Sequence, residues 1–159
     1  MCCPGHQLIA DGWSVLPLCW TDEAGDCACR RQHGPKSAGK APLTPHGVKD
    51  ATTDVAQVDI WSTWWPHANW GIACTGVTVV DIDDTDLAAL LKEDEELKQN
   101  HCMVSTPRRN GLHIYLKEDD PVQASRVLFS QDGRRLGEVQ RAGRYVVGPG
   151  SRIGSGHYR

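Results

Sequence analysis

The sequence predicts an α+β fold, in which two helices flank a mostly antiparallel sheet. Short runs of apolar and β-branched residues recur along the chain, and several of them are joined in pairs by glycine-containing turns. Two further segments instead repeat apolar residues at helical spacing. The length of 159 residues, with 40% hydrophobic and 23% charged residues, fits a single domain over residues 1–159.

The first strand is expected within residues 12–20, which read GWSVLPLCW. Residues 21–47 follow as a long polar segment with frequent Gly and Pro. A loop of that length without organisation of its own is uncommon in a compact domain. We therefore expect a specific interaction to hold this segment in place.

The first helix is expected within residues 53–66. Asp54 can cap its amino terminus, Gln57 follows three residues later, and Pro66 ends the helical pattern. Tryptophans in this segment can stack on single-stranded bases, but at helical spacing most of them are expected in the core. The apolar positions are Val58, Trp61 and Trp65, with Trp64 between them.

The remaining elements are strands and one more helix. A strand, a glycine turn and a second strand are expected over residues 69–83, and the helix over 84–100. Residues 102–118 predict a hairpin whose turn contains Asn110-Gly111. Residues 136–151 predict another strand, a turn and a strand. The leucines that share one side of the helix are Leu87, Leu90, Leu91 and Leu97.

The composition sets few limits on function. The net charge is −3 while the basic residues are clustered, so charge alone neither identifies nor excludes a nucleic-acid partner. No apolar run is long enough to span a membrane, and the first residues lack the pattern of a secretory signal. We therefore expect a cytoplasmic protein, in which clustered cysteines are more often metal ligands than disulfides.

Like charge gathers at the end of the strand GVTVVDIDD. Asp81 and Asp83 point to the same face because side chains alternate along a strand, whereas Ile82 points into the core. Two carboxylates that close repel each other unless a cation lies between them. Hard oxygen donors in this pattern suit Mg²⁺ or Mn²⁺. The alternative is a solvated strand end at which Asp84 or Asp86 caps the next helix.

The hairpin segment STPRRNGLHIYLK carries a second group of polar residues. A lone histidine in such a strand is more often structural than functional. Here the neighbouring residues supply donors that could bind a triphosphate. The candidate donors are Ser105, Thr106, Arg108, Arg109 and His113.

The long polar segment contains four residues with the spacing C-x7-C-x-C-x3-H. Structural zinc prefers four thiolate and imidazole ligands in a closed tetrahedral site, and such a site would hold the segment in place. The alternative is a set of reduced thiols without metal, and His6 or Cys102 could also replace one ligand. The predicted zinc-binding insertion spans residues 19–33, with Cys19, Cys27, Cys29 and His33 as ligands.

The segment GPKSAGKA is not a P-loop, although residues 34–40 satisfy G-x-x-x-x-G-K. Ala41 stands where that motif requires Ser or Thr. Pro42 then opposes entry into a helix.

Three motifs, taken in order, resemble a known family. Asp-x-Asp at 81–83 is followed by Gly-x-His at 111–113, and then by an acidic residue before G-x-Y-V-V-x-P-x-S at 143–151. With GWSVLPL, GKAPLTPHGVKDATTD and WWPHANWGIACTG, they resemble the primase–polymerase family of the archaeo-eukaryotic primase superfamily. From about residue 12 onward the chain is similar to the catalytic N-terminal domain of bifunctional primase/polymerase proteins of phages, plasmids and other mobile elements.

This resemblance implies an RRM-like catalytic core in which three carboxylates, Asp81, Asp83 and Glu138, hold the catalytic Mg²⁺ or Mn²⁺. It also implies that His113 lies beside the incoming nucleoside triphosphate and that Lys40 reaches it. Metal ions are what phosphoryl transfer needs, to help deprotonate the attacking hydroxyl and to stabilise the leaving pyrophosphate. Glu138 stands where the family more usually has aspartate, which keeps the carboxylate and moves its oxygens by one methylene.

A Cys-x-Cys element before Gly-Lys-x-Pro also resembles the family. The resemblance implies a zinc module near the template or the initiating nucleotide. Basic residues of this loop would then contact phosphates, in a salt-dependent way, or else form only a solvated basic surface. They are Arg30, Arg31 and Lys36.

The resulting hypothesis is a DNA primase, also able to extend primers, that uses a single-stranded DNA template and nucleoside triphosphates. We expect the chain to be part of a larger replication protein of a phage or mobile element, with a helicase domain as a further partner, in the host cytoplasm. One alternative is a metal-dependent nuclease in which the same carboxylates activate water. The other is a non-catalytic, zinc-stabilised module that binds single-stranded DNA.

Overall fold

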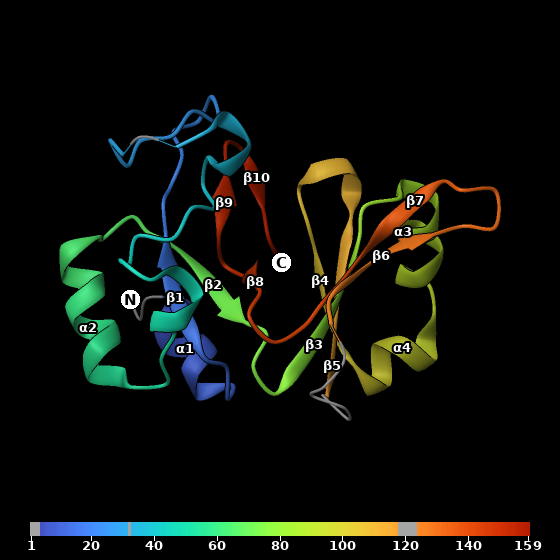
Figure 1. Cartoon of the computed structure of the whole chain (residues 1–159), viewed down its shortest axis with the longest axis horizontal. Helices are drawn as coiled ribbons and strands as arrows, with labels where there is room; N and C mark the ends of the chain where they lie inside the picture. Colours follow the sequence, from blue (N-terminus) through green and yellow to red (C-terminus); the bar gives the residue numbers. More distant parts are fainter. Residues whose placement is uncertain (1–3, 32, 118–123) are drawn as a thin grey trace. The chain divides into compact units, whose positions relative to one another are not determined.

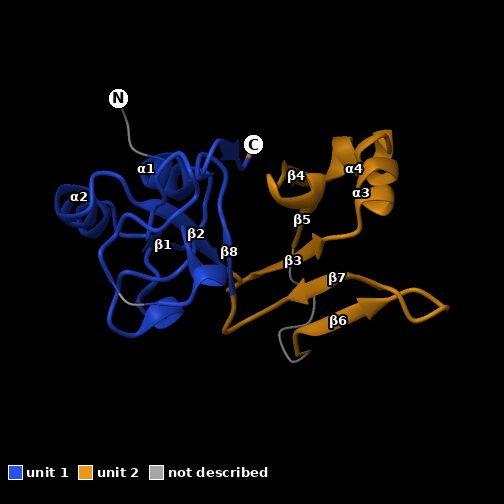
Figure 2. Ribbon diagram, turned by 90° about the horizontal axis from the view of Figure 1, so that it is seen from above, with its two compact units in different colours: residues 1–73, 145–158 blue, residues 74–144, 159 orange. Residues whose placement is uncertain are grey.

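The computed structural model describes residues 4–31, 33–117 and 124–159 and divides into two compact units. The first unit consists of residues 1–73 and 145–158, and the second of residues 74–144 with Arg159 (Figure 2). The chain therefore enters the second unit after two strands of the first and returns to complete the first unit's sheet. Cys2, Cys3 and Glu118 lie outside the described residues.

The first unit contains a three-stranded antiparallel sheet in the order β1-β2-β8. Figure 1 shows the helices α1 and α2 beside this sheet. A short two-stranded ribbon of β9 and β10 follows β8. The bounds are α1 Pro4–Ala10, β1 Val15–Leu18, η1 Pro35–Ser37, η2 Gly47–Asp50, α2 Val55–Trp64, β2 Asn69–Ala73, β8 Tyr145–Val147, β9 Arg152–Ile153 and β10 Gly156–His157.

The helix α2 confirms the predicted start and apolar face. The Asp54 carboxylate accepts a hydrogen bond from the backbone N–H of Ala56, which satisfies one of the free donors at the helix start. Trp61 is buried, with its ring 6.5 Å from that of Trp70 on β2. Trp64 is 62% exposed, so the tryptophans divide between core and surface.

The second unit is built on a five-stranded antiparallel sheet in the order β4-β5-β3-β7-β6. The central strand β3 is the acidic strand singled out in the sequence, and it pairs with β5 on one side and β7 on the other. The bounds are β3 Val77–Ile82, α3 Thr85–Lys92, α4 Glu95–Asn100, β4 Cys102–Ser105, η3 Arg108–Asn110, β5 Leu112–Lys117, β6 Arg126–Phe129 and β7 Arg135–Gln140.

Helices α3 and α4 cover one face of this sheet, as Figure 1 shows. Their leucines pack on a buried cluster that includes Ile82 of β3 and Leu112 and Ile114 of β5. Side chains alternate along each strand, so the residues between these positions point to the opposite face. That second face carries Asp81 and His113.

The helical region differs from the prediction of one helix over residues 84–100. The structure has two helices, because Asp94 caps a new helix start by accepting a hydrogen bond from the N–H of Leu97. Leu90 is 70% exposed, whereas the other three leucines pack on the sheet. The predicted hairpin is confirmed, with Asn110 and Gly111 in the turn between β4 and β5.

The α+β class with mostly antiparallel sheets is also confirmed. None of the helices in the described part of the chain is long and apolar enough to cross a membrane.

Candidate active site and metal centre

The centre of the second unit's sheet carries a row of three polar side chains. Asp81 on β3 pairs directly with His113 on β5 and with Glu138 on β7. Residues directly opposite each other in an antiparallel pair project from the same face with their Cβ atoms about 5 Å apart. The register therefore brings these three predicted site residues together on the face opposite α3 and α4.

Asp83 extends this row past the end of β3. Its backbone N–H donates to the carbonyl of Leu136 at 3.0 Å, so β3 and β7 stay paired there. Asp83 lies two residues beyond Asp81 and thus on the same face. The side chains of Asp81, Asp83 and Glu138 are 28%, 32% and 37% exposed, which leaves the carboxylates open to a ligand.

A glycine permits the close pairing of β3 with β7. Gly137 lies opposite Ile82, and a Cβ atom added to it would be only 2.0 Å from the carbonyl oxygen of Asp81. Any side chain here would therefore separate the two strands. Because Glu138 is the next residue, Gly137 fixes the distance of its carboxylate from Asp81.

His113 is buried beside Asp81. Its side chain is 5% exposed, and its Nε2 atom lies 3.4 Å from Oδ1 of Asp81. Its ring meets that of Tyr115 at 65° with centroids 6.3 Å apart. The histidine can therefore orient Asp81 and also present a polar atom beside it.

Arg135 joins two of the three carboxylates. One guanidinium nitrogen donates to Oδ2 of Asp83 at 2.8 Å, and the other donates to Oε1 of Glu138 at 2.6 Å. The hydrogen bond to Glu138 and the charge of Asp83 raise the pKa of Arg135 despite its partial desolvation. The sequence analysis did not select this residue, although it lies three positions before Glu138 in a basic run.

Beside the carboxylates lies a pocket of about 420 Å³, here called the arginine pocket. Three arginines meet the acidic residues there, and Arg134 lies 3.3 Å from the Asp84 carboxylate. The residues that line it are Asp83, Asp84, Thr85, Asp86, Arg109, Arg134 and Arg135.

The β4–β5 turn brings Arg109 to this pocket. Arg109 has a positive φ of 54°, and its carbonyl accepts a hydrogen bond from the Thr85 hydroxyl at 3.0 Å. Lys92 donates to the carbonyl of Asn110 at 2.7 Å. Both contacts attach the turn to α3. Arg108 is exposed and is not among the residues that line the pocket.

Three other predicted triphosphate ligands lie elsewhere. Ser105 pairs with Leu112, so its side chain projects from the face of the hydrophobic cluster rather than from that of His113. Thr106 is nearly buried, and its N–H donates to the carbonyl of Gly111. Lys40 belongs to the first unit, where its carbonyl accepts a hydrogen bond from the Tyr145 hydroxyl at 2.9 Å.

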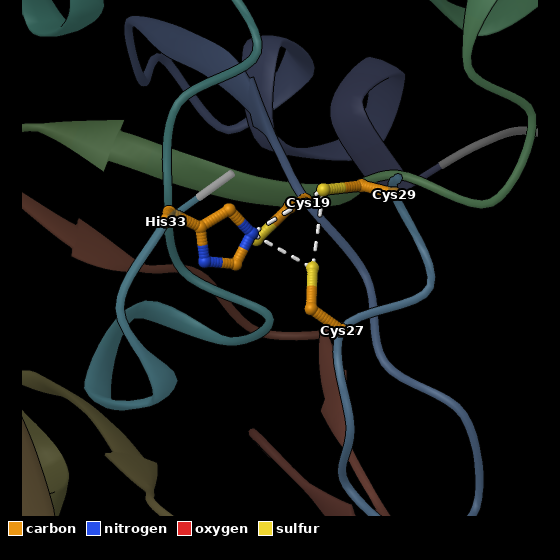
Figure 3. A group of neighbouring side chains, drawn as sticks. All are labelled: Cys19, Cys27, Cys29 and His33. Atoms are coloured by element: carbon orange, nitrogen blue, oxygen red, sulfur yellow. Dashed lines mark hydrogen bonds between the residues drawn. The ribbon is translucent and has the colours of Figure 1, made fainter. Parts of the chain in front are cut away.

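The four predicted zinc ligands come together in the first unit, as Figure 3 shows. Their ligand atoms all lie within 4.8 Å of one another. The Cys27 Sγ atom is 3.1 Å from that of Cys29 and 2.8 Å from Nε2 of His33. Ligands of tetrahedral zinc lie roughly 3.8 Å apart when the Zn–S bond is about 2.3 Å. Small side-chain rotations would therefore open the cluster, formed by Cys19, Cys27, Cys29 and His33, for one ion.

The surroundings of the cluster also suit a metal. The backbone N–H of Ala41 donates to Cys19 Sγ at 3.2 Å, which favours a thiolate. Nδ1 of His33 lies 3.3 Å from the Gly34 carbonyl, and a proton there leaves Nε2 free to bind metal. Burial nevertheless outweighs the hydrogen bond from Ala41 and raises the pKa of the Cys19 thiol to about 12 in the metal-free protein, so a bound metal would have to displace its proton. Cys27 is also desolvated, but hydrogen bonds from Cys29, Cys19 and His33 outweigh this and lower its pKa.

The alternative zinc ligands have other positions. His6 contacts the Asp59 carboxylate at 2.7 Å, and Cys102 lies on β4 of the second unit. Arg31 donates to the carbonyl of Leu43 at 2.6 Å and lies 5.5 Å from the centre of the Trp65 ring. Arg30 and Lys36 are exposed.

The family model described as "Bifunctional DNA primase/polymerase, N-terminal" matches residues 5–159. The chain belongs to this family. The match covers both units, so it includes the carboxylate row and the cysteine cluster, and it confirms the resemblance seen in the motifs. Membership implies a nucleotidyltransferase type of enzyme with DNA and nucleotides as substrates, in replication. A comparison with curated proteins gives no match.

Proposed function

We propose that this primase–polymerase family member synthesises primers on single-stranded DNA and extends them, by template-directed nucleotidyl transfer that depends on a divalent metal. The observation that carries the proposal is the row of His113, Asp81 and Glu138, with Asp83 beside it, on the open face of the sheet. We take residues 1–159 as one catalytic domain of a larger replication protein, for which a helicase domain and a cytoplasmic location are further proposals.

The residues present fit a divalent cation. The guanidinium of Arg135 stands in for one, since it binds oxygens of Asp83 and Glu138 at the same time. Carboxylate oxygens are the donors that Mg²⁺ and Mn²⁺ prefer. Asp81, Asp83 and Glu138 would hold the metal, which supplies charge stabilisation for the leaving pyrophosphate and favours loss of the proton from the attacking 3′-hydroxyl.

The protein's own side chains would place the nucleotide. Arg109 offers a guanidinium to the triphosphate at the mouth of the arginine pocket, and such a fork binds phosphate oxygens in pairs. His113 would orient Asp81 beside the incoming nucleotide. Ser105, Arg108 and Lys40 stay predictions as further triphosphate ligands.

The cysteine cluster would hold structural Zn²⁺. Zinc at Cys19, Cys27, Cys29 and His33 would fasten the polar loop to the end of β1, because Cys19 directly follows that strand. Arg30, Arg31 and Lys36 would then be displayed near the template. The two contacts of Arg31 with Leu43 and Trp65 favour a structural part for that residue.

The test is primer synthesis on unprimed single-stranded DNA with labelled nucleotides and Mn²⁺ or Mg²⁺. We compare wild type with Asp81→Asn/Asp83→Asn, which removes two charges and keeps the side-chain volume. Asp86→Asn is the matched control, since Asp86 lines the same pocket but lies on α3, outside the carboxylate row. We expect the double variant to lose at least about 10²-fold in rate and the control to keep most of it.

Two other outcomes would favour the alternatives. Shortening of the DNA when nucleotides are withheld, abolished by the double variant, would indicate a nuclease. Equal DNA binding by all variants, with no synthesis under either metal, would indicate a non-catalytic single-strand-binding module.

A further inference from the structure

The positively charged side chain of Arg135 lies where we propose that the metal binds. The two terminal nitrogens of Arg135 reach two different carboxylates, Asp83 at 2.8 Å and Glu138 at 2.6 Å. A planar guanidinium is suited to this because its donors form a rigid fork. Asp81, the third carboxylate, lies beside His113 instead, at 3.4 Å.

Arg135 and a divalent metal require the same oxygens. A metal held by Asp83 and Glu138 would take the oxygen atoms to which the guanidinium now donates. A divalent ion on these oxygens would lie a few ångströms from the guanidinium, and like charges this close repel, so we expect only one of the two cations at the site. Metal binding therefore requires Arg135 to leave its two carboxylates.

The Arg135 side chain can move into the arginine pocket when it leaves the carboxylates. Arg135 is 46% exposed and lines the arginine pocket with Arg109. A triphosphate in this pocket would offer phosphate oxygens, which bind arginine at least as well as carboxylates do. The released guanidinium would then add to the positive charge around the nucleotide.

We propose that Arg135 is an internal counter-cation that exchanges partners during loading. It contacts Asp83 and Glu138 in the metal-free protein and offsets part of their negative charge, yields them to the divalent metal, and then binds the triphosphate of the incoming nucleotide. This inference rests on the proposed metal-dependent nucleotidyl transfer. The exchange makes metal and nucleotide binding mutually favourable. A metal that takes the carboxylates releases Arg135 for the triphosphate, and a triphosphate that takes Arg135 releases the carboxylates for the metal.

The expected effect on metal affinity follows from the two contacts. A partly exposed ion pair changes an equilibrium constant by about threefold, and the two factors multiply, so the loss of both contacts should change it by about tenfold. Arg135→Gln should therefore bind Mn²⁺ about tenfold more tightly than wild type. Arg134→Gln is the matched control, because it removes the same charge from the same pocket while Arg134 contacts Asp84 instead. We expect a change of less than about threefold for it.

The measurement is a Mn²⁺ titration of the zinc-loaded full chain, with free Mn²⁺ followed by electron paramagnetic resonance. A second titration uses a non-hydrolysable nucleoside triphosphate at saturating Mn²⁺, where Arg135→Gln should bind about tenfold more weakly. The opposite signs of the two effects distinguish partner exchange from a structural role, since a damaged fold would weaken both. Arg135→Lys, which keeps one charge without the fork, should lie between wild type and Arg135→Gln in both titrations.

The outcomes separate this inference from the proposed function. If Asp81→Asn/Asp83→Asn binds Mn²⁺ as wild type does, the metal site itself is wrong and the proposed function fails. If that double variant loses Mn²⁺ but Arg135→Gln binds no more tightly than wild type, or no more tightly than Arg134→Gln, the exchange is overturned while the function stands.

Discussion

Replacement of Gly137 by alanine should damage both the sheet and the active site. An added Cβ would lie 2.0 Å from the carbonyl oxygen of Asp81, 2.9 Å from its carbon and 3.0 Å from Cα of Ile82. Carbon and oxygen atoms of neighbouring strands normally approach no closer than about 3.3 Å. All three contacts are with backbone, so no side-chain rotation can relieve them, and β7 must move away from β3 by roughly 1 Å.

The magnitude follows from what that movement disturbs. The carbonyl of Leu136 accepts hydrogen bonds from Asp83 and Asp84 at 3.0 and 3.1 Å, and each is worth about 1 kcal/mol. Overpacking adds about 1–3 kcal/mol. We expect a loss of about 3–5 kcal/mol in the free energy of unfolding. Glu138 would move with β7, so primer synthesis should also fall in the fraction of molecules that stays folded.

The assay is urea denaturation followed by circular dichroism, with primer synthesis measured well below the midpoint. Gly34→Ala is the control, because Gly34 has an ordinary φ of −65° and an added Cβ there meets nothing within 4 Å. It should change stability by less than about 0.5 kcal/mol. A Gly137→Ala protein with the stability and activity of wild type would show that the close β3–β7 approach does not constrain the site.

Two further predictions concern the cysteine cluster. Cys29→Ser should reduce bound zinc to well below one ion per chain and remove the stabilisation that zinc gives, which is about 2.7 kcal/mol when zinc is at a hundred times its dissociation constant. Atomic absorption measures the bound zinc, and thermal unfolding with added zinc measures the stabilisation. A wild-type melting temperature that does not change when zinc is chelated would argue against the site. The free energy of unfolding of the metal-free protein should fall by about 1.4 kcal/mol for each unit by which the pH rises between pH 9 and pH 12. Burial raises the pKa of Cys19 from 9.0 to about 12, so the unfolded chain loses this proton at lower pH than the folded protein does. The slope in urea-denaturation free energies should be absent from metal-free Cys19→Ala; an equal slope in that variant would assign it to other groups.

The parts of the site that could be predicted from sequence are those set by local periodicity. Alternation along a strand placed Asp81 and Asp83 on one face and Ile82 on the other, and the structure confirms this arrangement. Alternation does not say which strands are neighbours. That Asp81 lies opposite both His113 and Glu138 depends on pairing over long stretches of chain, and only the order of the family motifs indicated it.

The differences between the predicted and the observed structure have local causes that the sequence pattern does not indicate. Asp94 begins a new helix inside a charged run, and such a run looks the same as the exposed face of one longer helix. Ser105 lies close to the turn residues in the sequence, but the hairpin register places it opposite Leu112 and so on the other face from His113. The sequence does not point to Arg135, because alternation along a strand predicts that residues three apart lie on opposite faces.

The position of the carboxylates on the sheet explains how like charges can persist at the end of a core strand. The hydrophobic cluster packs on the opposite face, so the apolar packing of the sheet does not involve the acidic row. The row itself is about one-third exposed, and solvent there weakens its repulsion. Arg135 contacts two of its carboxylates and offsets one unit of their negative charge. The Arg135 side chain can offset carboxylate charge when no metal is bound and can also move away when a metal binds. Carboxylates that were buried and permanently paired could not bind a catalytic ion. We therefore expect this fold to form before its catalytic metal binds, and to bind that metal most tightly when a triphosphate is present to accept the arginine.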